Sequence, residues 1–290
     1  MVTVNPWIAG ARPKTLPAAV VPVAVGLSVA AGEDAVRWWL GVPALVVSLA
    51  LQVGVNYAND YSDGIRGTDD VRVGPLRLVG SGLVAPHKVK WAAFAAFGVS
   101  AVAGLIIAFA TSLWLLVVGV AAIAAGWFYT GGKNPYGYLG LGEVFVFTFF
   151  GLVATVGSTF AVSERMPSLS WLASVPVGCL ACALLVVNNL RDIPTDSSSG
   201  KKTLAVRLGD RRTRGFYALL CFLAVVFTVC AGIQRPAAVF GLIGLAAVLQ
   251  PLGSVRSGVT GRDLIAVLAA TGRAQMLFGV SLSFGLLIGA

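Results

Sequence analysis

The residues of this chain best suited to chemistry are aspartates, and they gather in two short segments. VNYANDYSDGIRGTDD occupies positions 55–70, and NNLRDIPTDSSSGKKT occupies positions 188–203. Half of the 12 acidic residues fall in these segments: Asp60, Asp63, Asp69, Asp70, Asp192 and Asp196. Each segment follows a long apolar run, where charged side chains are unfavourable unless they serve a site.

Two pairs among these aspartates have the spacing of neighbours on one helix face. Asp60 and Asp63 are three positions apart, and Asp192 and Asp196 are four apart. If the helices extend slightly beyond the apolar runs, each pair projects from a single face. Carboxylate oxygens suit hard cations such as Mg²⁺. Each pair could therefore hold one such ion, with both pairs facing a shared polar cavity.

Basic side chains are mixed with these aspartates: Arg66, Arg72, Arg77, Arg191, Lys201 and Lys202. Mg²⁺ commonly binds through one or two carboxylates together with substrate phosphates, and cationic side chains add direct contacts to the phosphate oxygens. The mixture predicts a diphosphate site. The alternative is that these charges form a solvated face beside the membrane. For Asp69 and Asp70, this alternative and a role in the site are equally good interpretations.

The elements that must position these side chains are membrane helices. Of the 290 residues, 57% are hydrophobic and 11% are charged, and the mean hydropathy is +0.87, which indicates an all-α integral membrane protein. The first apolar run could pass for a signal peptide, but it is long and contains two prolines, so we interpret it as a retained helix. Apolar runs long enough to span a bilayer predict nine transmembrane helices, at about 15–32, 38–57, 89–110, 112–130, 143–163, 171–190, 214–233, 236–253 and 273–290.

Charge asymmetry predicts the orientation of these spans. With a cytoplasmic N-terminus, 18 of the 21 Lys and Arg residues lie on the inner side, and only Arg37, Arg165 and Arg235 lie outside. Positively charged loops stay in the cytoplasm, so we predict a multi-pass protein of the cytoplasmic membrane with its site on the cytoplasmic side. The net charge of +9 sits in loops between spans, which favours a membrane surface or an anionic substrate over nucleic acid.

The two long inner segments organise the chain. We predict cytoplasmic loops over 58–88 and 191–213, each beginning where an even-numbered span ends, within a single domain over 1–290. Their similar openings, separated by four spans, suggest a duplicated four-helix unit with a ninth helix appended. Both aspartate pairs would then lie at helix C-termini, where the negative end of the helix dipole favours cations.

Two other features receive structural interpretations. Glu143 begins a predicted span, so we interpret it as a partner of the helix dipole rather than as a base. Cys179 and Cys182 form a C-x-x-C, but no histidine or second cysteine pair lies near them in the sequence. We therefore expect them to pack between helices.

The motifs carry a family resemblance. NDYSDGIRGTD and NNLRDIPTD resemble the two aspartate-rich motifs of UbiA-type intramembrane prenyltransferases, and nine spans agree with that family. Within the family the chain resembles the branch that prenylates 1,4-dihydroxy-2-naphthoate in menaquinone biosynthesis. The blocks that carry this resemblance are WIAGARPKTLPAAVVPVAVG, GPLRLVGSGL, FYTGGKNPYGYLGLGE and NNLRDIPTDSSSGKKTLAVRLG.

The resemblance implies roles for individual residues. Asp60 and Asp63 would bind one Mg²⁺ ion, and Asp192 and Asp196 a second, with the diphosphate of a polyprenyl donor between them. The residues implied in substrate binding are Asn56, Asn59, Arg66, Arg77, Tyr129, Lys133, Asn188, Arg191, Lys201 and Lys202, with Lys201 and Lys202 as alternatives and Arg77 and Lys133 as candidates for the acceptor's carboxylate. Gly67 stands where the wider family often has a further aspartate, and the dihydroxynaphthoate branch tolerates glycine at this position.

The implied reaction is transfer of a polyprenyl group to 1,4-dihydroxy-2-naphthoate with loss of CO₂, giving a demethylmenaquinone precursor. Two alternatives remain at this point: another aromatic acceptor, such as 4-hydroxybenzoate, and a cation or metabolite transporter. The predicted acids lie on one side of the membrane and not at its midplane, which weighs against transport.

Overall fold

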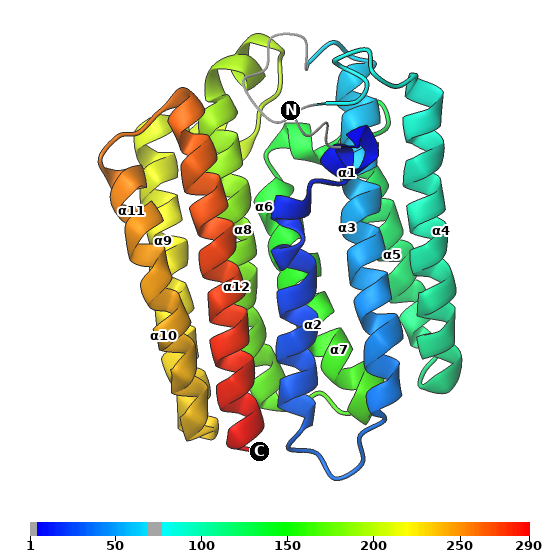
Figure 1. Cartoon of the computed structure of the whole chain (residues 1–290), viewed down its shortest axis with the longest axis vertical. Coiled ribbons are helices and arrows are strands. Elements are labelled where there is room, and N and C mark those ends of the chain that lie inside the picture. Colours follow the sequence, from blue (N-terminus) through cyan, green and yellow to red (C-terminus); the bar gives the residue numbers. More distant parts are fainter. Residues whose placement is uncertain (1–4, 69–76) are drawn as a thin grey trace.

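The computed structural model describes residues 5–68 and 77–290, and these residues form helices joined by short connections (Figure 1). The helices are α1 (Pro6–Ala11), α2 (Pro17–Ala30), α3 (Gly41–Gly64), α4 (Pro86–Ala110), α5 (Trp114–Phe128), α6 (Gly142–Val146), a π-helix (Phe147–Val153), α7 (Ala154–Ser163), α8 (Ser168–Ser198), α9 (Leu204–Gln234), α10 (Gly241–Leu245), α11 (Leu249–Arg256) and α12 (Leu264–Ile288). Short 3₁₀ segments cover Pro13–Thr15, Trp38–Leu40, Tyr136–Leu139, Pro236–Phe240, Ala246–Val248 and Gly261–Asp263.

The long helices have the length and composition of membrane spans. Among the described residues, seven helical segments qualify, and the bent pair Pro6–Thr15 and Pro17–Ala30 adds an eighth when counted as one span. Helix α5, at 15 residues, is apolar but shorter. The prediction of an all-helical membrane protein is confirmed.

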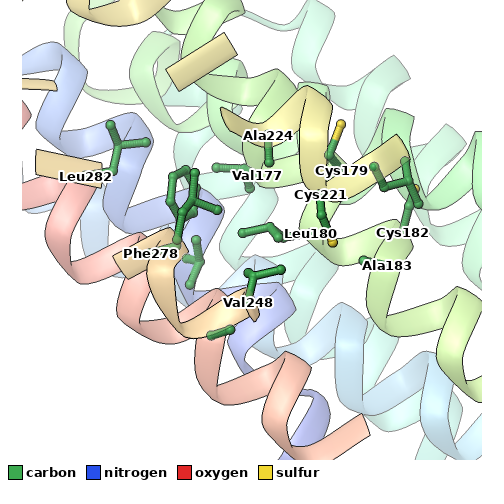
Figure 2. Packing of buried hydrophobic residues seen from close by; sticks show 14 of the residues in the cluster. Val177, Cys179, Leu180, Cys182, Ala183, Cys221, Ala224, Val248, Phe278 and Leu282 are labelled. Atoms are coloured by element: carbon green, nitrogen blue, oxygen red, sulfur yellow. The ribbon is translucent and has the colours of Figure 1, made fainter. Parts of the chain in front are cut away.

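Helix α8 lies at the centre of one half of the bundle and is the most buried of the candidate spans. It packs along α9 and also contacts α12, α2 and the π-helix. Figure 2 shows Leu180 of α8 in the same apolar cluster as Val248, Phe278 and Leu282. Cys179, Cys182 and Cys221 belong to this cluster too, and their thiols are buried and unlinked, as expected of packing residues.

Small residues allow the closest helix approach. A Cβ atom added to Gly151 of the π-helix would lie 2.6 Å from the Cα of Gly178 in α8, so position 151 tolerates no side chain without displacement of the backbone. Such glycine contacts are a common means of packing helices in lipid, where burial of apolar surface drives association only weakly.

Two helices extend further into polar sequence than hydropathy indicated. Helix α3 continues to Gly64 and α8 to Ser198, so both aspartate pairs lie within helices. The predicted loop over 191–213 is wrong for most of its length, because α8 continues to Ser198 and α9 begins at Leu204. Helix α9 is kinked at Gly209, whose φ of 74° is not helical. Hydropathy marks the part of a helix that suits hydrocarbon, whereas the backbone hydrogen bonds of the helix continue beyond it.

The predicted loop over 58–88 is also shorter, since 58–64 is helical and α4 starts at Pro86. Proline is favourable at this position because it has no N–H to leave unpaired. The C-terminal ends of α3 and α8 and the short helix α1 all lie at the same end of the bundle (Figure 1). This shared end brings the two motifs together.

Candidate active site

A cavity of about 630 Å³ opens between the two aspartate motifs. Its lining includes Ala44 and Asp63, which are about 28 Å apart along α3 at the usual rise per residue, so the cavity runs most of the length of that helix. Eight residues predicted for the site line it: Asn56, Asn59, Asp63, Tyr129, Asn188, Asp192, Asp196 and Lys201. The remaining lining is mostly apolar, and the acidic and amide side chains of the two motifs lie at one end of the cavity.

Asp63 is the centre of charge on the α3 side. Its side chain is almost fully buried, and Oδ1 accepts a hydrogen bond of 2.6 Å from the Tyr138 hydroxyl. The same oxygen lies 3.1 Å from Nζ of Lys201, and Oδ2 lies 3.7 Å from Nη2 of Arg77. Lys201 comes from the segment after α8, so this ion pair joins the two motifs directly.

Asp192 occupies the corresponding place on α8. The Arg191 guanidinium holds its carboxylate through Nε and Nη2, both at 2.7 Å, and Nη2 also donates to Oδ1 of Asn188 at 2.8 Å. Asp196 lies one turn further on and is only half-buried, and its backbone carbonyl accepts from the Lys201 amide at 2.9 Å. The predicted i, i+4 pair therefore does lie along one cavity-lining stretch of helix.

Asp60 has a different environment from the other three aspartates. It is fully buried and is absent from the cavity lining. Its Oδ2 accepts from the Leu78 amide at 2.8 Å, and its Oδ1 accepts from the Val79 amide at 2.9 Å. The turn over 77–82 packs closely against the end of α3, since a Cβ added to Gly64 would lie 2.4 Å from Cγ1 of Val79. Asp60 thus fastens the segment that carries Arg77.

The two asparagines of the first motif line the cavity and are also anchored. Nδ2 of Asn56 donates to the Ala11 carbonyl at 2.9 Å and to the Thr15 hydroxyl at 3.1 Å, which ties α3 to the end of α1 and to the 3₁₀ segment Pro13–Thr15. Oδ1 of Asn59 accepts from the Thr130 hydroxyl at 2.8 Å. Their positions relative to the cavity are therefore fixed by neighbouring elements.

Not every predicted cation reaches the cavity lining. Arg66 donates to the backbone carbonyls of Thr130 and Gly132, and its guanidinium lies over the Tyr138 ring. Lys133 and Lys202 are exposed. Of the two alternatives, Lys201 is thus the lysine that the fold brings to the cavity. Arg77 and Arg191 are buried just behind the aspartates, whereas Asp69, Asp70 and Arg72 lie outside the described residues.

Tyr138 is a site residue that the sequence reasoning missed. It lies in the 3₁₀ segment Tyr136–Leu139, lines the cavity, and faces both Asp63 and Lys201, whose Nζ is 4.7 Å from the ring centroid. Burial, and secondarily the Asp63 charge, raises the pKa of the Tyr138 phenol, so the hydroxyl remains a donor. Its place in the block YGYLGLGE was the available signal.

The chain is similar to known proteins over most of its length. Residues 19–284 match the UbiA prenyltransferase family. The chain belongs to that family. It is 49% identical to a 1,4-dihydroxy-2-naphthoate octaprenyltransferase of Mycobacterium tuberculosis over 98% of this chain and 97% of that protein. It is 31% identical to the protein of the same name from Bacillus subtilis, over 96% of this chain and 90% of the relative.

Solved structures of UbiA proteins share the fold at low sequence identity. A UbiA homologue from Aeropyrum pernix, in its apo form, superposes with a TM-score of 0.72 at 14% identity, covering 92% of this chain and 96% of that one. A homologue from Archaeoglobus fulgidus bound to GPP and Mg²⁺ gives a TM-score of 0.68 at 15% identity, covering 98% and 100%. The all-helical UbiA fold is therefore confirmed for this membrane prenyltransferase.

Proposed function

We propose that this protein transfers a polyprenyl group from a polyprenyl diphosphate to 1,4-dihydroxy-2-naphthoate, with loss of CO₂, in menaquinone biosynthesis. The observation that carries the proposal is that Asp63, Asp192, Asp196 and Lys201 line one end of a cavity whose remaining wall is mostly apolar. Such a cavity suits a substrate with a charged head and a long hydrocarbon tail. Relatives named for this reaction match over nearly the whole chain.

The acidic groups fit Mg²⁺. Carboxylates of Asp63, Asp192 and Asp196 share the cavity with the amide side chains of Asn56 and Asn188, and such oxygens are the ligands Mg²⁺ takes. Within 5–68 and 77–290, no three His, Cys, Asp or Glu side chains form a complete metal-binding cluster. That arrangement suits ions whose coordination is completed by water and substrate phosphates.

We assign Asp63 to one Mg²⁺ ion and Asp192 with Asp196 to the other. When bound, the two ions would neutralise the diphosphate and stabilise the charge that develops on it as it leaves. Asp60 stays a predicted ligand by its place in the motif, although both its carboxylate oxygens accept backbone amides here.

The chain's own residues would orient the donor and hold its charge. Lys201, 3.1 Å from Asp63, can turn its ammonium to a phosphate oxygen without leaving the cavity. Tyr138 can donate its hydroxyl to the same group. Such fixed donors lower the barrier to breaking the allylic C–O bond because they are already aimed where negative charge grows. The cleaved bond's electron pair leaves with the diphosphate, and a ring carbon of the acceptor bonds to the prenyl carbon.

The apolar part of the cavity would hold the first isoprene units and exclude water. Its lining includes Val23, Ala44, Ile107, Leu115 and Ala161, with no ionisable group among them. Water would trap an allylic cation, so a dry wall beside the reacting carbon protects the transfer. Helix α5 packs on α3 and α4 and contributes exposed apolar side chains on its outer face, as expected of a lipid-facing helix.

We further propose the membrane arrangement: a single domain of nine spans with a cytoplasmic N-terminus, built as two four-helix units plus α12. Counting the short α5 as a span brings the eight candidates to nine. An odd number of spans places α1 and the C-terminus at opposite ends of the bundle, as in Figure 1. Two arginines predicted outside have acidic partners remote from the site, Arg37 with Glu164 and Arg165 with Glu33. The aspartate motifs would then face the cytoplasm.

The test is an assay of the purified protein in lipid nanodiscs with Mg²⁺ and a polyprenyl diphosphate, offering 1,4-dihydroxy-2-naphthoate and 4-hydroxybenzoate in parallel. We expect a prenylated, decarboxylated product from the naphthoate alone. A product from 4-hydroxybenzoate alone would reassign the acceptor, and no product from either would favour a transporter. Asp192→Asn should abolish the product, whereas Asp263→Asn, a substitution at an exposed acid, should not.

A further inference from the structure

A buried polar pair outside the acidic and basic groups of the site reaches the same cavity. Nδ2 of Asn189 donates to Oε1 of Glu143 at 3.0 Å. Both side chains are more than nine-tenths buried, and Asn189 lines the cavity whereas Glu143 does not. Among the described residues, Oε2 of Glu143 has no hydrogen-bond partner. A buried acid with so few partners in a membrane helix is costly, which suggests a functional reason for keeping it.

The pair fixes the direction of the Asn189 amide. A carboxylate can only accept, so the contact with Glu143 engages the NH₂ group of Asn189. The contact with Glu143 leaves the carbonyl oxygen Oδ1 as the acceptor that Asn189 can present to the cavity. This oxygen can accept a hydrogen bond and cannot donate one, so it suits a hydroxyl and not a phosphate.

Aromatic rings line the same cavity as Asn189. Tyr129, Tyr136 and Phe145 all line the cavity; the rings of Tyr136 and Phe145 stack at 3.9 Å, and Tyr129 meets Tyr136 edge-on at 5.5 Å. Tyr129 lies against the residue before Glu143, since a Cβ added to Gly142 would be 3.2 Å from its Cε2. An aromatic lining with one amide oxygen is complementary to an aromatic ring that carries a hydroxyl.

The location along α8 is suitable for the reaction. Asn189 precedes Asp192 by three residues, which is about 4.5 Å along the helix and close to one turn. A ring bound at Asn189 would therefore lie next to a diphosphate bound at Asp192, on the side where the prenyl chain enters the apolar part of the cavity.

We propose that Oδ1 of Asn189, oriented by Glu143, accepts a hydrogen bond from a hydroxyl group of the aromatic acceptor and so selects a hydroxylated ring. This inference rests on the proposed prenyl transfer. The hydrogen bond draws electron density from the O–H bond into the ring and makes the attacking carbon more nucleophilic. The proton stays on the hydroxyl: the ring gains the prenyl carbon, and the electron pair of the bond to the carboxylate returns to the ring as CO₂ leaves. Glu143 is a positioning residue, because it acts through Asn189.

The experiment is a comparison of Asn189→Leu with Glu143→Gln in nanodiscs. Loss of one neutral hydrogen bond predicts an increase of roughly five- to tenfold in the KM for 1,4-dihydroxy-2-naphthoate in Asn189→Leu, with the KM for the polyprenyl diphosphate unchanged. Equilibrium binding of the acceptor without donor or Mg²⁺ should weaken by the same factor. Glu143→Gln retains an oxygen that can accept from Asn189, so it should remain near wild type, as should the exposed control Glu164→Gln.

A double variant addresses folding. Asn189→Leu leaves the Glu143 carboxylate without its partner, whereas Glu143→Leu combined with Asn189→Leu removes both polar groups and is expected to fold more readily. The double variant should show the same increase in acceptor KM. A rise in both KM values, or an unchanged acceptor KM in either Leu variant, would overturn the proposal.

Acceptor analogues identify the hydroxyl. The analogues 1-hydroxy-2-naphthoate and 4-hydroxy-2-naphthoate each lack one hydroxyl of 1,4-dihydroxy-2-naphthoate. For one of the two, the loss of binding affinity relative to the dihydroxy acceptor should be smaller in Asn189→Leu than in wild type. If the effects of the substitution and of the missing hydroxyl on binding are fully additive for both analogues, Asn189 does not contact either hydroxyl. If wild-type protein gives no prenylated naphthoate, the proposed function fails first, and that outcome is distinct from an active enzyme whose variants bind the acceptor normally.

Discussion

Replacing Asp60 with asparagine should loosen the 77–82 turn. The Asp60 carboxylate accepts the amides of Leu78 and Val79 at 2.8 and 2.9 Å in a fully buried place. Asparagine keeps one accepting oxygen and presents an NH₂ group to the other amide. Losing one charge-assisted hydrogen bond and leaving a buried N–H unpaired together cost about 3 kcal/mol. Opening of the turn should become roughly 100-fold more frequent.

Hydrogen–deuterium exchange measures this opening. In peptides that cover 77–84, the amides of Leu78 and Val79 should exchange roughly 100-fold faster in Asp60→Asn than in wild type. The exposed-acid variant Asp263→Asn serves as the matched control and should leave these peptides unchanged. We expect prenyl transfer to fall as well, because Arg77 lies 3.7 Å from Asp63 and depends on the turn. Unchanged exchange together with lost activity would refute the anchoring role and favour direct metal binding by Asp60.

Three further substitutions test the cavity. Lys201→Ala should raise the KM for the prenyl diphosphate at least tenfold, whereas Lys202→Ala should change this KM less than twofold, because of these two lysines only Lys201 lines the cavity. Equal effects of the two substitutions in a steady-state assay would contradict this assignment. Tyr138→Phe removes the 2.6 Å hydrogen bond to Asp63. Losing a hydrogen bond to a charged group costs about 1.5–3 kcal/mol, which predicts a decrease in kcat/KM of roughly 10- to 100-fold. A decrease under threefold would argue against a role for the hydroxyl. Gly157→Leu adds a side chain to the apolar part of the cavity, at a position where nothing lies within 4 Å of an added Cβ. Turnover with a long polyprenyl diphosphate should therefore fall far more than turnover with dimethylallyl diphosphate. An equal loss with both donors would show that the tail does not pass this position.

Much of the site could be predicted from the sequence because its evidence is local. Apolar runs and charge asymmetry indicate membrane helices and their orientation. The spacing of Asp63, Asp192 and Asp196 places them at helix ends, and their mixture with basic residues predicts a diphosphate. These properties depend on residues that are close in the chain, so no knowledge of packing is needed.

Other assignments depended on contacts between distant segments. The same motif contains Asp60 and Asp63, one turn apart, yet Asp63 faces the cavity while Asp60 faces the 77–82 turn. Helical spacing gives the relative direction of two side chains and says nothing of what lies opposite each one. The choice between Lys201 and Lys202 also depended on the tertiary fold, which places the segment after α8 close to the end of α3 and puts Nζ of Lys201 3.1 Å from Oδ1 of Asp63.

By itself, then, the sequence determined the membrane class and the helical fold, and it predicted the chemistry of the two acidic segments, because hydropathy and side-chain type are properties of the chain. Only the tertiary structure decided which groups share the cavity: Tyr138 beside Asp63, and Asn189 held by Glu143. The physical reason is that a side chain's role depends on what it faces, and the facing groups come from helices far apart in the sequence.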